Sequence, residues 1–375
     1  MHYLDHAATT PVPEEVAQAM LDVLTRNFGN PSSQYKLGRD AKALVDDSRA
    51  SLAHILACKP DQLIFTSCGT EADNWAIHAA LHQNRRVGKH IVTTAVEHSA
   101  VLQCAKQLEQ EGFSVSYVRP DGQGRIAADQ IAAALRGDTA LVSVMLVNNE
   151  TGARFPVEEI ARLLKNHPAL LHTDAVQGFL KVPFTVKTLP ADFISVSAHK
   201  IGGPKGIGAL YFGGKAKKLR PLLFGGGQEF GLRPGTEAVA QIVGFAKAAQ
   251  LRFDRFEAVS QHLRHCRDYA VHRLQEIPDL RVIGSGGAPH ILAVSLPGYP
   301  SQNIVSELSD SGIYISAGSA CHRGKASHVF SAMGLDRKAA AGTVRISFGP
   351  DTSLEDIDAL AFALAEHQRS RFPML

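Results

Sequence analysis

Short apolar runs alternate with amphipathic helical segments from about residue 38 to residue 215, and this alternation constrains the fold most. The strand-like runs are Gln62–Thr66, His90–Thr94, Phe113–Val118, Ala140–Val147, Ala169–Thr173, Phe193–Ser197 and Ile207–Phe212. The helical segments between the first of them are Arg39–Leu56, Glu71–Leu81 and Ser99–Gln110. Such alternation is typical of βαβ units. It predicts an α/β fold with a mostly parallel sheet that is covered by helices on both faces.

A glycine-rich segment, Phe224–Gly231, separates this region from the rest of the chain. A long helical stretch is predicted over Glu237–Glu276, followed by short strands and helices. The strands are expected at Ala293–Leu296, Ile313–Ile315 and Val344–Phe348, and the helices at Gln302–Ser309 and Leu354–Ala365. We therefore expect a large domain over residues 16–250 and a smaller α/β domain over residues 251–375. The segment 1–15 is expected to pack with the small domain.

Composition excludes several classes of protein. The formal net charge of the 375 residues is +3 and the basic residues are scattered, so a nucleic-acid or membrane surface is not indicated. The first residues lack the pattern of a signal peptide, and no apolar run approaches the roughly 18 residues of a membrane span. The 5 cysteines form no CxxC pair, which argues against a disulfide framework or a zinc site. We expect a cytoplasmic protein without a bound metal.

Lys200 and Asp174 each stand at the end of an apolar run, and the pair points to an enzyme that uses pyridoxal phosphate. A lysine amine can carry this cofactor as a Schiff base, while a carboxylate keeps the pyridine nitrogen protonated. In a mostly parallel sheet, ligands bind beyond the carboxyl ends of the strands, where both residues are expected. The glycine-rich turn after Lys200 does not fit the phosphate-loop pattern of nucleotide-binding proteins.

Three further strand ends carry polar residues that could contact such a cofactor. Ser67–Glu71 joins a strand to a helix N-terminus, which favours anion binding through Gly69 and Thr70. The alternative there is a capping box, with Thr70 as N-cap and Asp73 as its partner. His98 could stack on a pyridine ring or could be structural. Asn149 follows another strand and could donate to the phenolic oxygen of the cofactor, whereas His172 is interpreted as a structural histidine of the core.

Two residues of the predicted small domain could act on a substrate. Arg345 is a charge within an apolar strand, and such an arginine pairs with a carboxylate that is either structural or part of a substrate. Cys321 lies among small residues with His322, Arg323 and Lys325 nearby, an electropositive setting that favours a reactive thiolate.

Taken together, these segments resemble the cysteine desulfurases, fold-type I pyridoxal-phosphate enzymes of the aminotransferase class V group. The resemblance runs through nearly the whole chain in order. Its motifs are Tyr3–Pro11, Phe28–Ser33, Thr66–Asn74, Glu97–His98, Val147–Gly152, Asp174–Gln177, Ser197–Lys200, Arg233–Thr236, Gly318–Cys321 and Val344–Ser347. It implies a large domain with a mostly parallel seven-stranded sheet, the cofactor pyridoxal 5'-phosphate and a homodimer.

The resemblance also implies a role for each site residue. Lys200 would bind the cofactor and move the Cα proton of the substrate, with Asp174 at the pyridine nitrogen and His98 on the ring. Asn149 and Gln177 would contact the phenolic oxygen. The phosphate would be held by Gly69, Thr70, Ser197 and His199, and by Thr236 of the partner subunit. Arg345 would grip the substrate carboxylate with two hydrogen bonds, helped by Asn30 and Asn149. Cys321 would attack the sulfur of L-cysteine, leaving L-alanine and a persulfide on Cys321.

The sequence departs from the family at two places. Gln34–Tyr35 stands where a histidine is common, and the segment after Cys321 is basic and about two residues short. The leading hypothesis is a cysteine desulfurase that passes sulfur to an acceptor protein, such as an iron–sulfur scaffold or a thiolation enzyme. The alternatives are a related lyase, either a selenocysteine lyase or a β-eliminating enzyme, and a sulfur-carrier scaffold with little turnover. The retained Lys200, Asp174 and His98 argue against the scaffold.

Overall fold

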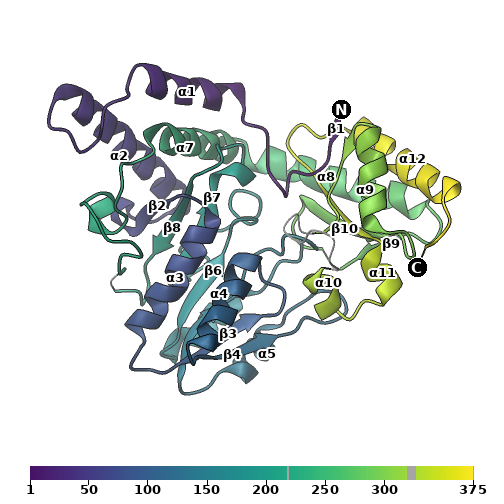
Figure 1. Cartoon of the computed structure of the whole chain (residues 1–375), viewed down its shortest axis with the longest axis horizontal. Coiled ribbons are helices and arrows are strands. Elements are labelled where there is room, and N and C mark those ends of the chain that lie inside the picture. Colours follow the sequence, from purple (N-terminus) through teal and green to yellow (C-terminus); the bar gives the residue numbers. More distant parts are fainter. Residues whose placement is uncertain (218, 285, 319–326, 375) are drawn as a thin grey trace.

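The computed structural model describes residues 1–217, 219–284, 286–318 and 327–374. Its larger sheet has seven strands in the order β2-β8-β7-β6-β5-β3-β4 (Figure 1). Their bounds are β2 Leu63–Thr66, β3 His90–Thr94, β4 Ser114–Val118, β5 Thr139–Ser143, β6 Leu170–Asp174, β7 Phe193–Ser197 and β8 Gly208–Phe212. Strand β8 runs antiparallel to the other six strands, which are parallel to one another. The predicted α/β class with a mostly parallel seven-stranded sheet is confirmed.

Helices cover both faces of this sheet because neighbouring strand residues point to opposite faces. One face packs against α3 (Gly69–Gln83) and α4 (Ser99–Gln110), with strand residues such as Phe193. The other face packs against α2 (Lys36–Leu56) and α7 (Val239–Asp254), with strand residues such as Ile194. The remaining helices of this part of the chain are α1 Glu14–Thr25, α5 Ala128–Ala134 and α6 Val157–Leu163.

A second hydrophobic cluster lies in the C-terminal part of the chain. It forms around an antiparallel sheet in the order β12-β10-β9, between the helices α8, α9 and α12. The elements of this part are α8 Phe256–Gln275, β9 Arg281–Ile283, β10 Ile291–Ser295, α9 Ser301–Asp310, β11 Ile313–Tyr314, α10 His328–Ala332, α11 Arg337–Ala341, β12 Thr343–Ser347 and α12 Leu354–Ser370. Strand β1 (His2–Tyr3) pairs with β11, and Leu4 is buried in the same cluster. The domain limits expected from the sequence stay a prediction.

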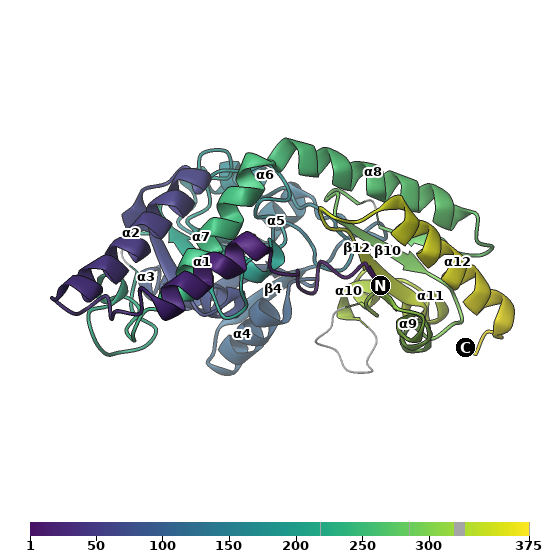
Figure 2. The same cartoon turned by 90° about the horizontal axis from the view of Figure 1, so that it is seen from above.

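Three predicted elements differ clearly from the structure, and the simplest case is α12, which continues to Ser370 beyond the predicted end at Ala365. The long helix expected over Glu237–Glu276 is broken at Arg255, which has non-helical φ/ψ angles of −111° and 13°. The break lets α7 pack on α1 and α2 while α8 packs on α12 (Figure 2). The strand expected over Ala140–Val147 ends at Ser143, although the chain beyond it stays hydrogen-bonded to β6 through Val144 and Leu146.

The buried His172 is structural, as predicted. Its Nδ1 lies 2.8 Å from Ser143 Oγ and its Nε2 lies 3.0 Å from Ser195 Oγ, so the ring joins three adjacent strands. Among the described residues, no helix combines the length and apolar character needed to cross a membrane.

Candidate active site

A cavity of about 260 Å³ lies at the carboxyl ends of β2, β6 and β7, and most of the predicted site residues line it. Those residues are Gly69, Thr70, His98, Asn149, Asp174, Gln177, Ser197, His199, Lys200 and Arg345. They come from segments far apart in the sequence, and the parallel arrangement of β2, β6 and β7 brings them to one edge of the sheet.

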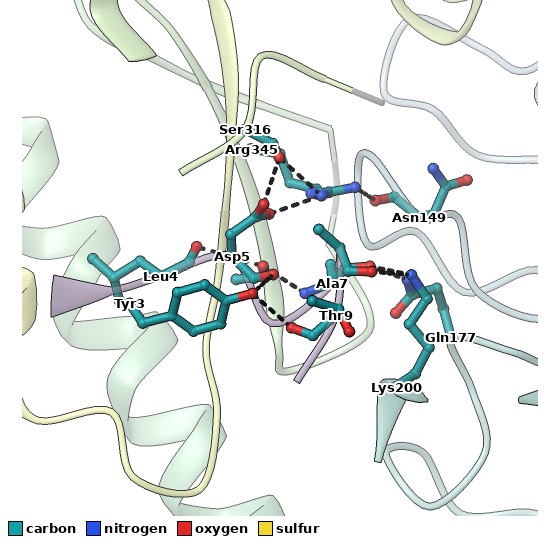
Figure 3. Close-up of polar contacts among 12 residues, drawn as sticks. Tyr3, Leu4, Asp5, Ala7, Thr9, Asn149, Gln177, Lys200, Ser316 and Arg345 are labelled. Carbon is teal, nitrogen blue, oxygen red and sulfur yellow. Dashed lines mark hydrogen bonds and ion pairs between the residues drawn. The ribbon is translucent and has the colours of Figure 1, made fainter. Parts of the chain in front are cut away.

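Lys200 and Asp174 are placed by two adjacent strands. Asp174 is the last residue of β6, and Lys200 ends a short 3-10 turn directly after β7. Lys200 Nζ donates to the backbone carbonyls of Ala7 and Ala8, each at 2.7 Å (Figure 3). The N-terminal segment thus reaches the amine that the sequence assigns to the cofactor.

Asp174 is buried at the wall of the cavity, close to a second carboxylate, Asp73. The Oδ1 of Asp174 accepts from the Val176 N–H at 2.9 Å. Burial and the nearby Asp73 raise the pKa of Asp174 to about 6, although His98 opposes the rise. One ligand atom of each of these three side chains lies within 4.8 Å of the others. A cation at this position, such as a protonated pyridine nitrogen, would favour the ionised form of Asp174.

His98 begins α4 as its N-cap residue. Its Nδ1 accepts from the Ala100 N–H at 3.2 Å, so in the neutral ring the proton sits on Nε2. The hydrogen bond fixes both the ring at the cavity wall and its tautomer.

The part of the cavity beside Gly69 and Ser197 could hold a phosphate group. Helix α3 begins at Gly69, where a Cβ atom would lie only 2.8 Å from Val176 Cγ2, so a larger residue there would have to displace the Val176 side chain. The buried Ser197 Oγ has no hydrogen-bond partner among the described residues. Burial and the nearby Lys200 lower the pKa of His199 to about 3, so this ring is neutral. A helix N-terminus beside an unpaired hydroxyl is a suitable anion site.

The alternative capping box at this helix is wrong. The N-cap of α3 is Cys68, which makes no side-chain cap hydrogen bond. Asp73 is buried instead, and its Oδ1 lies 3.4 Å from His172 Nε2. The Asp73 side chain therefore faces the buried His172 and does not cap the helix.

Gln177 has an amide whose orientation is fixed by unambiguous partners. Its Oε1 accepts from Lys181 Nζ at 3.1 Å, and its Nε2 donates to the Ala7 carbonyl at 2.8 Å. His290 Nε2 lies 3.3 Å from the same Oε1. Because Lys181 and His290 occupy Oε1 and Ala7 accepts one N–H group, only the second N–H group of the Gln177 amide is left to contact a ligand in the cavity.

Arg345 pairs with a carboxylate of the protein itself, that of Asp5. The sequence left open whether the partner of Arg345 is structural or part of a substrate, and in this structure it is structural. The Nη2 of Arg345 lies 2.8 Å from Asp5 Oδ1, and the Arg345 side chain is 3% exposed. The charge that the sequence places in the small domain is therefore paired with the N-terminal segment.

Two described residues of the predicted site, Thr236 and Asn30, do not line the cavity. Thr236 is exposed. Asn30 is exposed, and its side-chain oxygen accepts from the Ser32 N–H at 2.9 Å. Cys321 lies outside the described residues.

Several residues around the cavity were missed by the sequence analysis. Glu97 is fully buried and accepts hydrogen bonds from Met145 N at 3.0 Å and Thr94 Oγ1 at 2.8 Å. Burial raises the pKa of Glu97 to about 8. Lys181 is also buried, and burial together with the charge of Lys200 lowers its pKa well below the usual range. In the sequence, the only signal for Glu97 or for Lys181 was its position near residues of the family motifs.

The fold and the cavity define the class of protein. Three features of the cavity fit pyridoxal phosphate: a lysine directly after β7, a buried carboxylate at the end of the adjacent β6, and an anion site at a helix N-terminus. The α/β fold is that of fold-type I enzymes. Residues 2–360 match the family model described as Aminotransferase class-V. The chain belongs to this family.

Similar proteins narrow the family. "Cysteine desulfurase IscS" of Methanosarcina thermophila is 40% identical over 368 residues, which cover 97% of this chain and 91% of that protein. The solved structure titled "NIFS-LIKE PROTEIN" has a TM-score of 0.92 at 35% identity, covering 98% of this chain and 99% of that one. The structure titled "SspA in complex with cysteine" has a TM-score of 0.82 at 33% identity, covering 94% and 100%.

Proposed function

We propose that the chain is a pyridoxal-phosphate-dependent cysteine desulfurase that acts as a homodimer. The single observation that carries the proposal is the cavity in which Lys200, Asp174, His98 and Arg345 face one another. The relatives named cysteine desulfurase support the activity, and the related structure solved with cysteine supports the substrate.

When bound, pyridoxal phosphate supplies an electron sink for the bonds that are broken at the substrate Cα and Cβ atoms. Lys200 Nζ would hold the cofactor and move the Cα proton. The Asp174 carboxylate would keep a proton on the ring nitrogen, and the His98 ring would cover one face of the cofactor. The burial of Asp174 strengthens this interaction, because little water competes for the charge.

The polar rim would orient cofactor and substrate. Gln177 would donate to the phenolic oxygen from its fixed N–H, together with Asn149. Gly69, Thr70, Ser197 and His199 would hold the phosphate, together with Thr236 of the other subunit. Arg345 would bind the α-carboxylate, with Asn149 and Asn30 as further donors.

The sulfur would leave on Cys321. The Cys321 thiolate attacks the sulfur of L-cysteine, so an S–S bond forms while the Cβ–S bond breaks and Cβ becomes the methyl group of L-alanine. The sum of L-cysteine and a Cys321 thiol gives L-alanine and a Cys321 persulfide, and no external oxidant is needed. A sulfur-acceptor protein would then remove the outer sulfur.

The test supplies the holoenzyme with L-cysteine and dithiothreitol and measures alanine, sulfide and pyruvate together. Equal amounts of alanine and sulfide are expected, with no pyruvate. Pyruvate in place of alanine would indicate a β-eliminating lyase, and at most one sulfur per chain would indicate a carrier scaffold. Repetition with L-selenocysteine on a Cys321→Ala variant separates a selenocysteine lyase, which needs no protein thiol.

A further inference from the structure

The guanidinium of Arg345 is held by three acceptors from three segments of the chain (Figure 3). Its Nη2 donates to Asp5 Oδ1 at 2.8 Å and to Ser316 Oγ at 3.2 Å. Its Nη1 donates to the Asn149 carbonyl at 2.9 Å. Ser316 Oγ in turn donates to Asp5 Oδ2 at 2.8 Å, so both oxygens of Asp5 are engaged.

These contacts leave few donors for a substrate. A guanidinium has five N–H groups, of which Nη2 carries two and Nη1 carries two. Both Nη2 hydrogens and one Nη1 hydrogen are used, and the buried Nε has no partner among the described residues. Two of the five N–H groups therefore remain, one on Nη1 and the buried one on Nε, together with the charge. The paired grip expected from the sequence would require Asp5 to be displaced from Nη2.

Asp5 is itself fixed firmly to the small sheet. Residues Asp5 and Ser347 form a backbone bridge, and the Ala7 N–H donates to Ser347 Oγ at 2.8 Å. Tyr3 Oη closes the turn that follows, donating to the Thr9 carbonyl at 2.8 Å and to the Asp5 carbonyl at 3.3 Å. The carboxylate is thus presented by a segment that has little freedom to move away.

We propose that Asp5 is a positioning residue that orients Arg345, and that it thereby sets how strongly the site selects a substrate with an α-carboxylate. The inference rests on the proposed function, in which Arg345 binds that carboxylate. Asp5 and Ser316 turn Nη2 away from the cavity, and the remaining Nη1 hydrogen contacts the substrate. Without Asp5, the buried guanidinium loses its charged partner and turns toward other acceptors.

The opposite role would make Asp5 a competitor that occupies Arg345 until the substrate displaces it. The two roles predict effects of opposite sign. Loss of a positioning carboxylate weakens substrate binding, whereas loss of a competitor strengthens it. The anchoring of Asp5 through its backbone and through Ser316 favours positioning, because displacement would break the Ser316 bond as well as the ion pair.

The experiment compares four variants of the holoenzyme. Asp5→Ala removes the carboxylate, Asp5→Asn keeps an acceptor oxygen without the charge, and Ser316→Ala removes the hydroxyl. Tyr3→Phe is the matched control, since it loosens the same segment and leaves the carboxylate in place. Calorimetry measures the Kd of L-alanine and of ethylamine, which differ only by the carboxylate, and steady-state kinetics give KM and kcat for L-cysteine.

For Asp5→Ala we expect the Kd of L-alanine and the KM of L-cysteine to rise about five- to tenfold, no more than loss of Arg345 itself, since the contact of Arg345 with the carboxylate is lost. The Kd of ethylamine and kcat should change less than about threefold. Asp5→Asn should lie between Asp5→Ala and the wild type, Ser316→Ala should show a smaller effect, and Tyr3→Phe should match the wild type.

An unchanged or lower Kd of L-alanine in both Asp5 variants would overturn the proposal, and so would equal weakening of L-alanine and ethylamine. If Asp5→Ala does not fold or retain its yellow colour, Asp5→Asn decides alone. A wild-type protein that makes no alanine from L-cysteine refutes the proposed function. The comparison of L-alanine with ethylamine requires no turnover, so it still tests Asp5 in that case.

Discussion

Replacement of Glu97 by glutamine should change the pH dependence of stability, because this carboxyl group is buried behind the cavity. Burial raises its pKa from the usual 4.5 to about 8, and the charges of Asp174 and Asp73 act in the same direction. The folded protein therefore keeps a proton on Glu97 at pH values where the unfolded chain has released it. The free energy of unfolding falls as the pH rises from about 4.5 to about 8.

The size of the effect follows from these values. One pH unit between the two pKa values corresponds to about 1.4 kcal/mol, so the whole window amounts to about 5 kcal/mol. Between pH 5.5 and pH 8.5 the part that is lost is about 3 kcal/mol. Glutamine carries no charge at either pH. The variant should therefore gain about 3 kcal/mol relative to the wild type on going from pH 5.5 to pH 8.5.

Urea unfolding of the holoenzyme at the two pH values, at one protein concentration, measures this difference. Glu71→Gln is the matched control. Burial opposes ionisation of Glu71, but hydrogen bonds from Arg233 and Ser67 lower its pKa, so its contribution is lost only in acid and its effect should be equal at both pH values. A Glu97→Gln effect that is also equal at both pH values would refute the reasoning.

Four further predictions concern the site and its support. Borohydride should fix pyridoxal phosphate to Lys200, and Lys200→Ala should lose this product in a peptide map; attachment to another lysine would contradict the assignment. Arg345→Ala should weaken L-cysteine binding about tenfold, in keeping with one charge-assisted hydrogen bond, while absorption of the bound cofactor persists. Cys321→Ala should bind cofactor and L-cysteine normally but form no protein persulfide by mass spectrometry, and a persulfide on another cysteine would remove Cys321 from the mechanism. Glu229→Ala should lower the free energy of unfolding by about 3–5 kcal/mol, because it leaves the buried Arg49 unpaired, and Arg49→Met added to it should restore much of the loss in the same urea assay.

Much of the fold could be predicted from apolar periodicity alone. The strands His90–Thr94 and Phe193–Ser197 and the helix Ser99–Gln110 have the predicted bounds. Turn residues bound these segments, and the apolar residues that form the pattern are the ones that the fold buries, so the local pattern and the tertiary packing agree. The break at Arg255 could not be predicted, since it has no glycine or proline and results from a change of packing partner.

The side chains that line the cavity could also be found, because they stand at strand ends where polar residues are unusual. The residues that support them carry no such mark. From the sequence, Asp73 was a candidate capping residue and Glu97 was only the residue before His98. In the structure, both carboxyl groups are buried near Asp174. Their effect arises from desolvation and mutual repulsion, which depend on distances that a single sequence does not contain.

The N-terminal segment shows most clearly why such support escapes a sequence. Ala7 and Ala8 act on Lys200 through backbone carbonyls, which every residue has, so no residue type marks them. The same segment brings Asp5 to Arg345 across 340 positions of sequence. The pairing of β1 with β11 and the bridge between Asp5 and Ser347 set this register, and a shift by one residue would turn the Asp5 side chain to the other face. Lys200 and Arg345 are therefore linked through the short segment Asp5–Ala8, of which residues 6–8 form a turn, and perturbation of β1 should affect both together.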